Sequence, residues 1–453
     1  MSRYLFVVPP LVGHVNPVVG VAAELAARGH ATAWAGVPEL IGRLAGSEAE
    51  VFRCAVALAP DAVPERPPEL RGPAALKFLW EDFLVPLADA MAPGVAEAIE
   101  HFRPDVLVVD QQAVAGALVA ERAGLPWATS ATTSAELTGP LDGMPLVEGW
   151  VRDRLAELRS RLSGPDDPDG PPLNERATNP PRAEGRAGDV SEERGNDRRR
   201  RECGSDDRRH RVRAPGGERA TNTDPRFSPY LVLAFSTAEL ASSATSAGGP
   251  IRFVGPSLAA RPSGTAFPWE WLDPDRALVL VTLGTANSDA GAAFLSHSQT
   301  SLRTRSKRLQ AVIVDPGGLL GAPALDPDVL VLPHVPQLDL LARAAAVVCH
   351  AGHNTVCEAL WHGVPLVVAP IRDDQPVVAA QVVAAGTGVR LRFGRTTAER
   401  LGQALDAVLD DPAYRAAAQR VGASFRAAGG ATAAADHLER LAVERPLTPG
   451  SSQ

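Results

Sequence analysis

Short apolar runs alternate along the chain with segments whose apolar residues recur at helical spacing. Residues 4–8 form an apolar run, and residues 18–28 place their apolar side chains on one helical face. This alternation is typical of parallel sheets covered by helices on both faces, so the sequence predicts an α/β protein. Further strands are expected at 31–35, 105–110, 126–130, 277–283, 310–314, 329–332, 346–349 and 366–369, and further helices at 86–101 and 114–123.

The length of the chain and a break in this pattern set the expected domains. A chain of 453 residues is too long for one ordinary core, so two domains are expected. A proline-rich stretch, 256–276, separates the two blocks of strands. We therefore predict an N-terminal domain at 1–255, a linker at 256–276, a C-terminal domain at 277–445 and a tail at 446–453.

Residues 160–226 do not fit the pattern, because they contain few apolar side chains and are dense in Arg, Asp, Gly and Pro. Such a segment cannot bury enough apolar surface to offset its ordering entropy, so a disordered insertion is one interpretation. A basic arm for a polyanion is a second, although acidic residues are nearly as common there. A third is that a shifted reading frame produced both this segment and the irregular stretch 296–309. Matching peptides in a mass spectrum would exclude the third.

Charge and cysteine usage narrow the class of protein. The net charge of -8 argues against a general nucleic-acid binder. The four cysteines show no metal-ligand spacing, which favours a reduced, cytoplasmic protein with no metal site. The first apolar run is short and ends at Pro9-Pro10, so we expect a strand there rather than a signal peptide. No apolar stretch approaches the ~20 residues that span a bilayer.

The densest group of chemistry-bearing residues begins where the strand expected at 346–349 ends. His350 can donate a hydrogen bond or carry a positive charge, and Gly352 permits close backbone approach. Asn354 and Thr355 can cap a helix that starts there, and the free N–H groups of a helix N-terminus suit a diphosphate. These residues predict a phosphate site.

Two further features of the same segment suit a sugar nucleotide. Glu358 lies one turn into the expected helix, where its carboxylate can accept hydrogen bonds from a ribose. Asp374 and Gln375 offer an acceptor and a donor for vicinal sugar hydroxyls. Upstream, the strand expected at 277–283 ends in a Gly-Thr turn.

This run resembles the donor-binding signature of family 1 nucleotide-sugar glycosyltransferases, which have the GT-B fold. The family's base-stacking tryptophan is His334 here, the tryptophan inside the plant motif is His353, and its serine is Thr355. These departures look like the bacterial natural-product, or macrolide-type, branch. The resemblance implies a donor-binding set of Gly284, Thr285, His334, Val335, Gln337, His350, Gly352, Asn354, Thr355, Glu358, Asp374 and Gln375.

A histidine follows the first expected strand, in Gly13-His14-Val15-Asn16-Pro17, which we expect to be a loop. Ligands gather at such strand ends in open parallel sheets, and a histidine there can act as a general base. The segment resembles the family's Gly-His-x-x-Pro loop, whose histidine deprotonates the acceptor. Asp110, at the end of another strand, matches the carboxylate that orients that histidine in the family.

The resemblance implies two Rossmann-like domains facing across a cleft, with acceptor bound by the first and donor by the second. A final helix in the 430s would return to brace the first domain. The implied activity is inverting, metal-independent transfer from a UDP- or dTDP-sugar to a hydroxyl of a small hydrophobic aglycone, in antibiotic or other secondary metabolism. No cofactor is implied beyond this co-substrate.

Two alternatives stay open at this point. One is a non-catalytic nucleotide-sugar-binding auxiliary protein of the same fold, and the other is an epimerase acting on the sugar nucleotide itself. Expected partners are the donor and the acceptor, with an auxiliary protein or a homodimer as further options, and neither nucleic acid nor a membrane segment. The oligomeric state, the sugar and the acceptor do not follow from the sequence.

Overall fold

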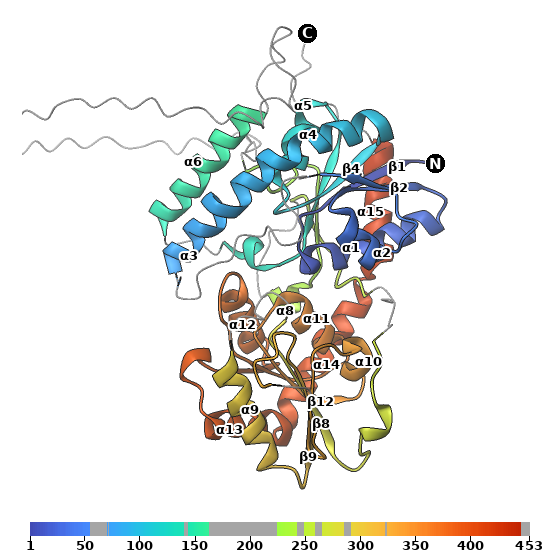
Figure 1. Ribbon diagram of the computed structural model, residues 1–453. Helices are drawn as coiled ribbons and strands as arrows, with labels where there is room; N and C mark the ends of the chain where they lie inside the picture. The colour runs from blue at the N-terminus through green and yellow to red at the C-terminus, as the bar shows by residue number, and fades with distance from the viewer. Residues whose placement is uncertain are drawn as a thin grey trace, which may run out of the picture.

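A computed structural model of the chain shows two α/β units, one above the other in the view of Figure 1. Each unit is built around its own seven-stranded sheet. The structure describes residues 1–54, 70, 72–139, 144–162, 224–241, 249–258, 265–284, 291–321 and 324–444.

The first sheet is parallel throughout, with the order β3-β2-β1-β4-β5-β6-β7. Its two faces are both covered: Leu5 and Val7 of β1 pack toward α4 and α5, whereas Tyr4 and Phe6 pack toward α1 and α15. The strands are β1 (Arg3–Val7), β2 (Ala31–Gly36), β3 (Val51–Arg53), β4 (Val106–Asp110), β5 (Trp127–Ala131), β6 (Leu231–Ala234) and β7 (Ile251–Phe253). The helices are α1 (Val12–Ala27), α2 (Pro38–Ala45), α3 (Gly72–Phe78), the π-helix η1 (Leu79–Leu84), α4 (Val85–Phe102), α5 (Val114–Arg122), the 3₁₀ helix η2 (Ala135–Thr138), α6 (Pro145–Leu162) and α8 (Ala238–Ala241).

The second sheet has the order β10-β11-β9-β8-β12-β13-β14 and is parallel except for β10 at its edge. Alternate residues of β8 again face opposite helix layers, Leu278 and Leu280 on one side and Val279 and Val281 on the other. The strands are β8 (Ala277–Thr282), β9 (Leu309–Val314), β10 (Ala324–Leu325), β11 (Val329–Leu332), β12 (Ala344–Cys349), β13 (Leu366–Val368) and β14 (Gly388–Arg390). The helices are η3 (Trp269–Trp271), α9 (Ala292–Arg303), α10 (Gln337–Leu341), α11 (His353–Trp361), α12 (Gln375–Ala384), η5 (Phe393–Arg395), α13 (Ala398–Asp410) and α14 (Pro412–Ala427).

The last helix, α15 (Gly430–Glu444), returns to the first unit, where Figure 1 shows it beside α1. Leu438 joins the same apolar cluster as Phe6. At the rim, Arg28 Nη1 lies 2.7 Å from an oxygen of Asp436 and 2.7 Å from one of Glu439. The expected bracing helix is therefore confirmed.

The first helix begins earlier than its sequence suggests. The segment Gly13–Pro17, expected as a loop, forms the first turns of α1, which starts at Val12. Proline inside a helix normally removes a backbone hydrogen bond and ends or kinks the helix, yet α1 continues past Pro17. The loop prediction was wrong, and His14 lies on a helix.

The predictions for the two irregular segments, 160–226 and 296–309, have different outcomes. Residues 160–162 belong to α6, where Leu158 and Leu162 are buried, so the aberrant segment was placed too early. At its other end, Arg226 forms an ion pair of 2.7 Å with Glu136. Residues 163–223, which carry the predictions of disorder and of a basic arm, lie outside the described residues. In the second stretch, α9 runs to Arg303 without a break.

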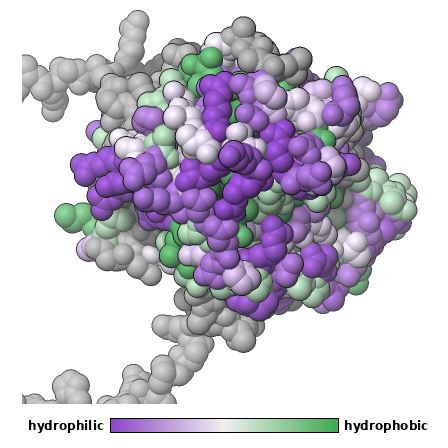
Figure 2. Space-filling model, turned by 90° about the horizontal axis from the view of Figure 1, so that it is seen from below, coloured by the Kyte–Doolittle hydropathy of each residue, from purple (hydrophilic) through white to green (hydrophobic). Residues whose placement is uncertain are grey.

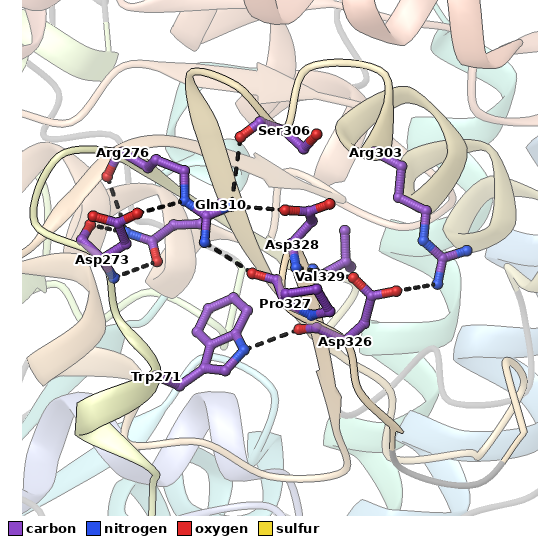
Figure 3. Close-up of polar contacts among 10 residues, drawn as sticks. All are labelled: Trp271, Asp273, Arg276, Arg303, Ser306, Gln310, Asp326, Pro327, Asp328 and Val329. Carbon is purple, nitrogen blue, oxygen red and sulfur yellow. Dashed lines mark hydrogen bonds and ion pairs between the residues drawn. The ribbon is translucent and has the colours of Figure 1, made fainter.

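The start of the second unit is fastened to its sheet at the end remote from the first unit (Figures 1 and 3). The buried side chain of Gln310 accepts from the N–H of Asp273 at 2.9 Å and donates to the carbonyls of Asp273 and Arg276, at 2.6 and 2.9 Å. Arg276 in turn reaches Asp328 at 2.8 Å. Seen from below, this end of the molecule presents a mostly hydrophilic face (Figure 2).

Replacing Gln310 with Met is expected to lower the free energy of unfolding by about 1–3 kcal/mol, because three partly buried backbone groups lose their partner. Urea denaturation measures this. Arg303→Ala, which removes an exposed ion pair with Asp326 in the same region, is the control and should cost about 0–1 kcal/mol. Equal losses of unfolding free energy in the two variants would contradict the stabilising role of the Gln310 hydrogen bonds.

Candidate active site

Three polar side chains meet where neighbouring strands of the first sheet end. His14 lies in the first turn of α1 after β1, Asp110 ends β4, and Thr132 follows β5. The Nδ1 atom of His14 is 2.9 Å from Asp110 Oδ1 and 2.9 Å from Thr132 Oγ1, while Thr132 donates to Asp110 Oδ2 at 3.1 Å. Strand order reverses between β1 and β4, which is where open α/β sheets bind ligands.

The pair of His14 and Asp110 has a defined protonation pattern. An ionised carboxylate only accepts hydrogen bonds, so Nδ1 of His14 carries the proton and Nε2 is left free of it. Burial lowers the pKa of His14, but the charge and the hydrogen bond of Asp110 outweigh it and raise the pKa above its usual value. Asp110 is fully buried and also accepts from the backbone N–H of Gln112 at 2.8 Å. This arrangement suits a base held by an orienting carboxylate.

The second sheet repeats the arrangement at its own reversal of strand order, between β8 and β12. His350 follows β12 and its ring lies against Gly284, which follows β8. A Cβ atom on Gly284 would come within 2.8 Å of the ring, and its φ of +72° also favours glycine. A Cβ on Gly352 would also collide with the same ring. Ala351, which lies between His350 and Gly352 in the sequence, has a φ of +66°, an uncommon value that often marks a functional site.

His350 is a neutral hydrogen-bonding group in this setting. Burial lowers its pKa to about 4. Its Nδ1 atom is buried and has no hydrogen-bond partner within the described residues. A buried polar atom of this kind is uncommon in native proteins, which makes the Nδ1 atom of His350 a candidate to bond a phosphate oxygen.

The helix that follows, α11, starts one residue before the position expected. Gly352 is its N-cap, and among the described residues no side chain caps it. Asn354 and Thr355 therefore lie inside the first turn, and the prediction that they cap the helix was wrong. The N–H groups of that turn and the positive end of the helix dipole suit an anion.

The other residues implied for the nucleotide differ in their burial and surroundings. Glu358 is almost fully buried and accepts from Gln337 Nε2 at 2.6 Å. Glu358 also lines a hollow between the two units with Asn354 of α11 and residues 256–258 of the linker. His334 is exposed and Val335 packs against the core of the second unit. Thr285 lies outside the described residues.

Asp374 and Gln375 lie at the start of α12. The Oε1 atom of Gln375 accepts from the backbone N–H groups of Ile371 and Arg372, at 2.8 and 3.0 Å, which fixes the preceding loop. Burial raises the pKa of Asp374, against the effect of a hydrogen bond from the Thr133 side chain. This carboxyl group also acts electrostatically on His14 across the seam between the units.

The two groups of residues form one region. Asn354 Nδ2 donates to the carbonyl of Gly13, next to His14, at 2.8 Å. Ser134 Oγ donates to Gln381 Oε1 of α12 at 3.0 Å. The residues expected to bind the donor therefore adjoin the residues expected to act on the acceptor.

Sequence reasoning missed Thr132, Thr133, Glu136 and Arg226. All of them lie in or contact the segment after β5. Burial raises the pKa of Glu136, although Arg226 opposes this, and Glu136 also acts on His14. Two adjacent threonines at the end of a strand next to β4 were the available signal for this segment.

Two absences hold for the part of the chain that the structure describes. No group of three or more His, Cys, Asp or Glu side chains there could hold a metal ion. None of its helices combines the length and the apolar character needed to cross a membrane.

Comparison with known proteins identifies the family. The sequence model of the family described as UDP-glucoronosyl and UDP-glucosyl transferase matches residues 318–425. The chain is 30% identical to 4'-demethylrebeccamycin synthase of Lentzea aerocolonigenes over 454 residues, which cover 97% of this chain and 99% of that relative. The chain belongs to this glycosyltransferase family.

The fold of this glycosyltransferase has close counterparts. The chain is 29% identical in sequence to demethyllactenocin mycarosyltransferase of Streptomyces fradiae over 459 residues, which cover 97% of this chain and 87% of that relative. Its structure is similar to the glycotransferase of kitacinnamycin, with a TM-score of 0.68, 23% identity, and 97% and 98% of the two chains covered. It is also similar to spinosyn rhamnosyltransferase SpnG complexed with thymidine diphosphate, with a TM-score of 0.64 and 21% identity; the match covers 96% of this chain and 100% of that one. The expected GT-B fold is confirmed.

In this glycosyltransferase, Asp110→Asn is expected to move the acidic limb of the pH–rate profile to lower pH. The carboxylate raises the pKa of His14 and burial lowers it, so without the charge burial dominates. We also expect kcat to fall about 10²–10⁴-fold, because asparagine can hold the imidazole in the wrong tautomer. Rates measured between about pH 5 and 9 check this. An acidic limb that stays in place or moves upward would contradict the pairing.

Proposed function

We propose that the protein transfers a sugar from a UDP- or dTDP-linked donor to a hydroxyl of a small natural-product aglycone, with inversion at the anomeric carbon and without a metal ion. The observation that carries the proposal is the contact between the two candidate half-sites. Asn354, at the N-terminus of α11, donates to the residue that precedes His14. A diphosphate on α11 would therefore present its sugar close to the imidazole.

The first step follows from the state of His14. Its Nε2 atom removes the proton of the acceptor hydroxyl, and Asp110 stabilises the imidazolium that forms. The acceptor oxygen then bonds to C1 of the sugar. The bond from C1 to the diphosphate oxygen breaks on the opposite face, and its electron pair leaves with the nucleoside diphosphate. One displacement of this kind inverts the anomeric centre.

The leaving diphosphate gains negative charge as that bond breaks. The N–H groups at the start of α11 and the buried His350 are already oriented, so they stabilise this charge without reorganisation. Thr355 can add a hydroxyl. These groups supply the stabilisation that a metal ion gives in other phosphate chemistry, which supports a metal-independent reaction.

The nature of donor and acceptor is supported by the relatives. The family description favours a UDP-sugar, whereas a similar fold was solved with thymidine diphosphate. The relatives named above act in making rebeccamycin-type and lactenocin-type compounds, by their names, which favours a natural-product aglycone. Glu358 lines the hollow between the units, and its carboxylate can accept hydrogen bonds from the ribose of either nucleotide.

A mass-spectrometric screen of UDP- and dTDP-sugars against mixed aglycones is expected to give glycosylated products with the native protein. His14→Ala should lower turnover by at least about 10²-fold while leaving nucleoside diphosphate affinity within about twofold, because the imidazole acts in chemistry. Calorimetry with UDP and dTDP measures the affinity. Unchanged turnover would disprove the role of His14. Binding without any product would favour the auxiliary protein, and donor turnover without acceptor the epimerase.

His350→Gln is expected to keep nucleoside diphosphate affinity within about fivefold of the native value, whereas His350→Ala should weaken it by about tenfold or more. The reason is that a neutral imidazole contributes a hydrogen bond, which a carboxamide can replace, rather than a charge. Titration calorimetry with UDP and dTDP compares the two. An equal loss in both variants would show that the charge or the ring itself is needed.

A further inference from the structure

The helix that carries His14 contains an open carbonyl. In a regular α-helix, the N–H of residue 17 would donate to the carbonyl of Gly13. Residue 17 is proline and has no N–H, and Pro17 lies inside α1. The carbonyl beside His14 is therefore free of its usual helical partner, at an exposed position that faces the second unit.

Asn354 of the second unit supplies the missing donor. Its Nδ2 atom lies 2.8 Å from the Gly13 carbonyl oxygen. The approach is close, since a Cβ atom on Gly13 would lie 3.6 Å from that same nitrogen. A carboxamide nitrogen carries two N–H groups, so one N–H can bond Gly13 while the other is available to a phosphate oxygen at the start of α11.

We propose that Asn354 is a positioning residue that joins the diphosphate-binding turn of α11 to the general base His14, and that Pro17 keeps the Gly13 carbonyl open to receive it. This inference rests on the proposed function. A bound diphosphate would hold the Asn354 amide, and the amide would hold the first turn of α1. Donor occupancy is thereby coupled to the placement of the imidazole.

Other contacts along the seam do not perform this task. Ser134 meets Gln381, and Thr237 Oγ1 lies 2.8 Å from Ser424 Oγ, but neither contact touches α1. These bonds dock the two units whether or not Asn354 is present. Loss of the Asn354 bond should therefore affect the rate of transfer more than it affects folding.

Pro17→Ala tests the coupling without altering either partner of the bond. It restores an N–H that can donate to Gly13 within α1 and so competes with Asn354. The matched control is Pro93→Ala, since Pro93 also lies inside a helix, α4, in the first unit. We expect kcat to fall about three- to tenfold in Pro17→Ala, with UDP or dTDP affinity within about twofold, and no change in Pro93→Ala.

The double variant Pro17→Ala/Asn354→Ala separates coupling from a local effect on the helix. Asn354→Ala alone should lower both kcat and nucleotide affinity, and adding Pro17→Ala should change kcat by less than about twofold further. Independent, multiplying effects would overturn the inference. So would a Pro17→Ala variant with the kcat of Pro93→Ala, while transfer by the native protein would leave the proposed function intact.

A second test of the coupling uses NMR and needs no acceptor. In protein labelled with ¹³C at histidine Cε1, the His14 signal is identified by its absence from His14→Ala. Addition of UDP or dTDP should shift this signal in the native protein and in Pro93→Ala, and by less than half as much in Pro17→Ala. Equal shifts in all three would refute the coupling. A native protein that binds neither nucleotide would refute both this inference and the proposed function.

Discussion

The parallel order of the strands is the constraint from which the site follows. In a parallel sheet the carboxyl ends of all strands lie at one edge, and helices that cross to either side leave an opening where strand order reverses. The reversal between β1 and β4 brings His14 to Asp110, and the reversal between β8 and β12 brings Gly284 to His350. The two openings face one another because the units dock edge to edge along a seam of side-chain hydrogen bonds.

The two central histidines have opposite environments, and each environment suits a different task. His14 is paired with a buried carboxylate and has a raised pKa, which gives a base that can take a proton near neutral pH. His350 is packed against Gly284 and Gly352, and burial lowers its pKa to about 4. A neutral ring at that place can donate to a phosphate without a permanent charge that would hold the product diphosphate strongly. Environments that separate the pKa values of similar groups are typical of active sites.

Much of this arrangement could be predicted from sequence, because it depends on strand ends. The apolar runs place His14, Asp110 and His350 at or after the ends of strands. Because the strands are parallel, those ends lie at one edge of each sheet. The role of Thr132 could not be predicted, since it depends on where a hydroxyl points after β5. The start of α1 was misplaced for a related reason. Pro17 forbids one helical bond, yet α1 continues through it, and the carbonyl that it leaves open is bonded by Asn354, far along the chain.

The chain crosses between the units twice, and the two crossings touch. The N–H of Gly430 donates to the carbonyl of Val254 at 2.6 Å, and Gly255 packs against the carbonyl of Phe425 so closely that a Cβ atom there would lie 2.7 Å from it. Both Gly255 and Gly430 have positive φ values, as tight chain reversals require. The two covalent connections between the units therefore lie side by side at one place. The bond from Asn354 to Gly13 joins the same two units away from these connections in the sequence, so the contact beside His14 can form only when the units are docked.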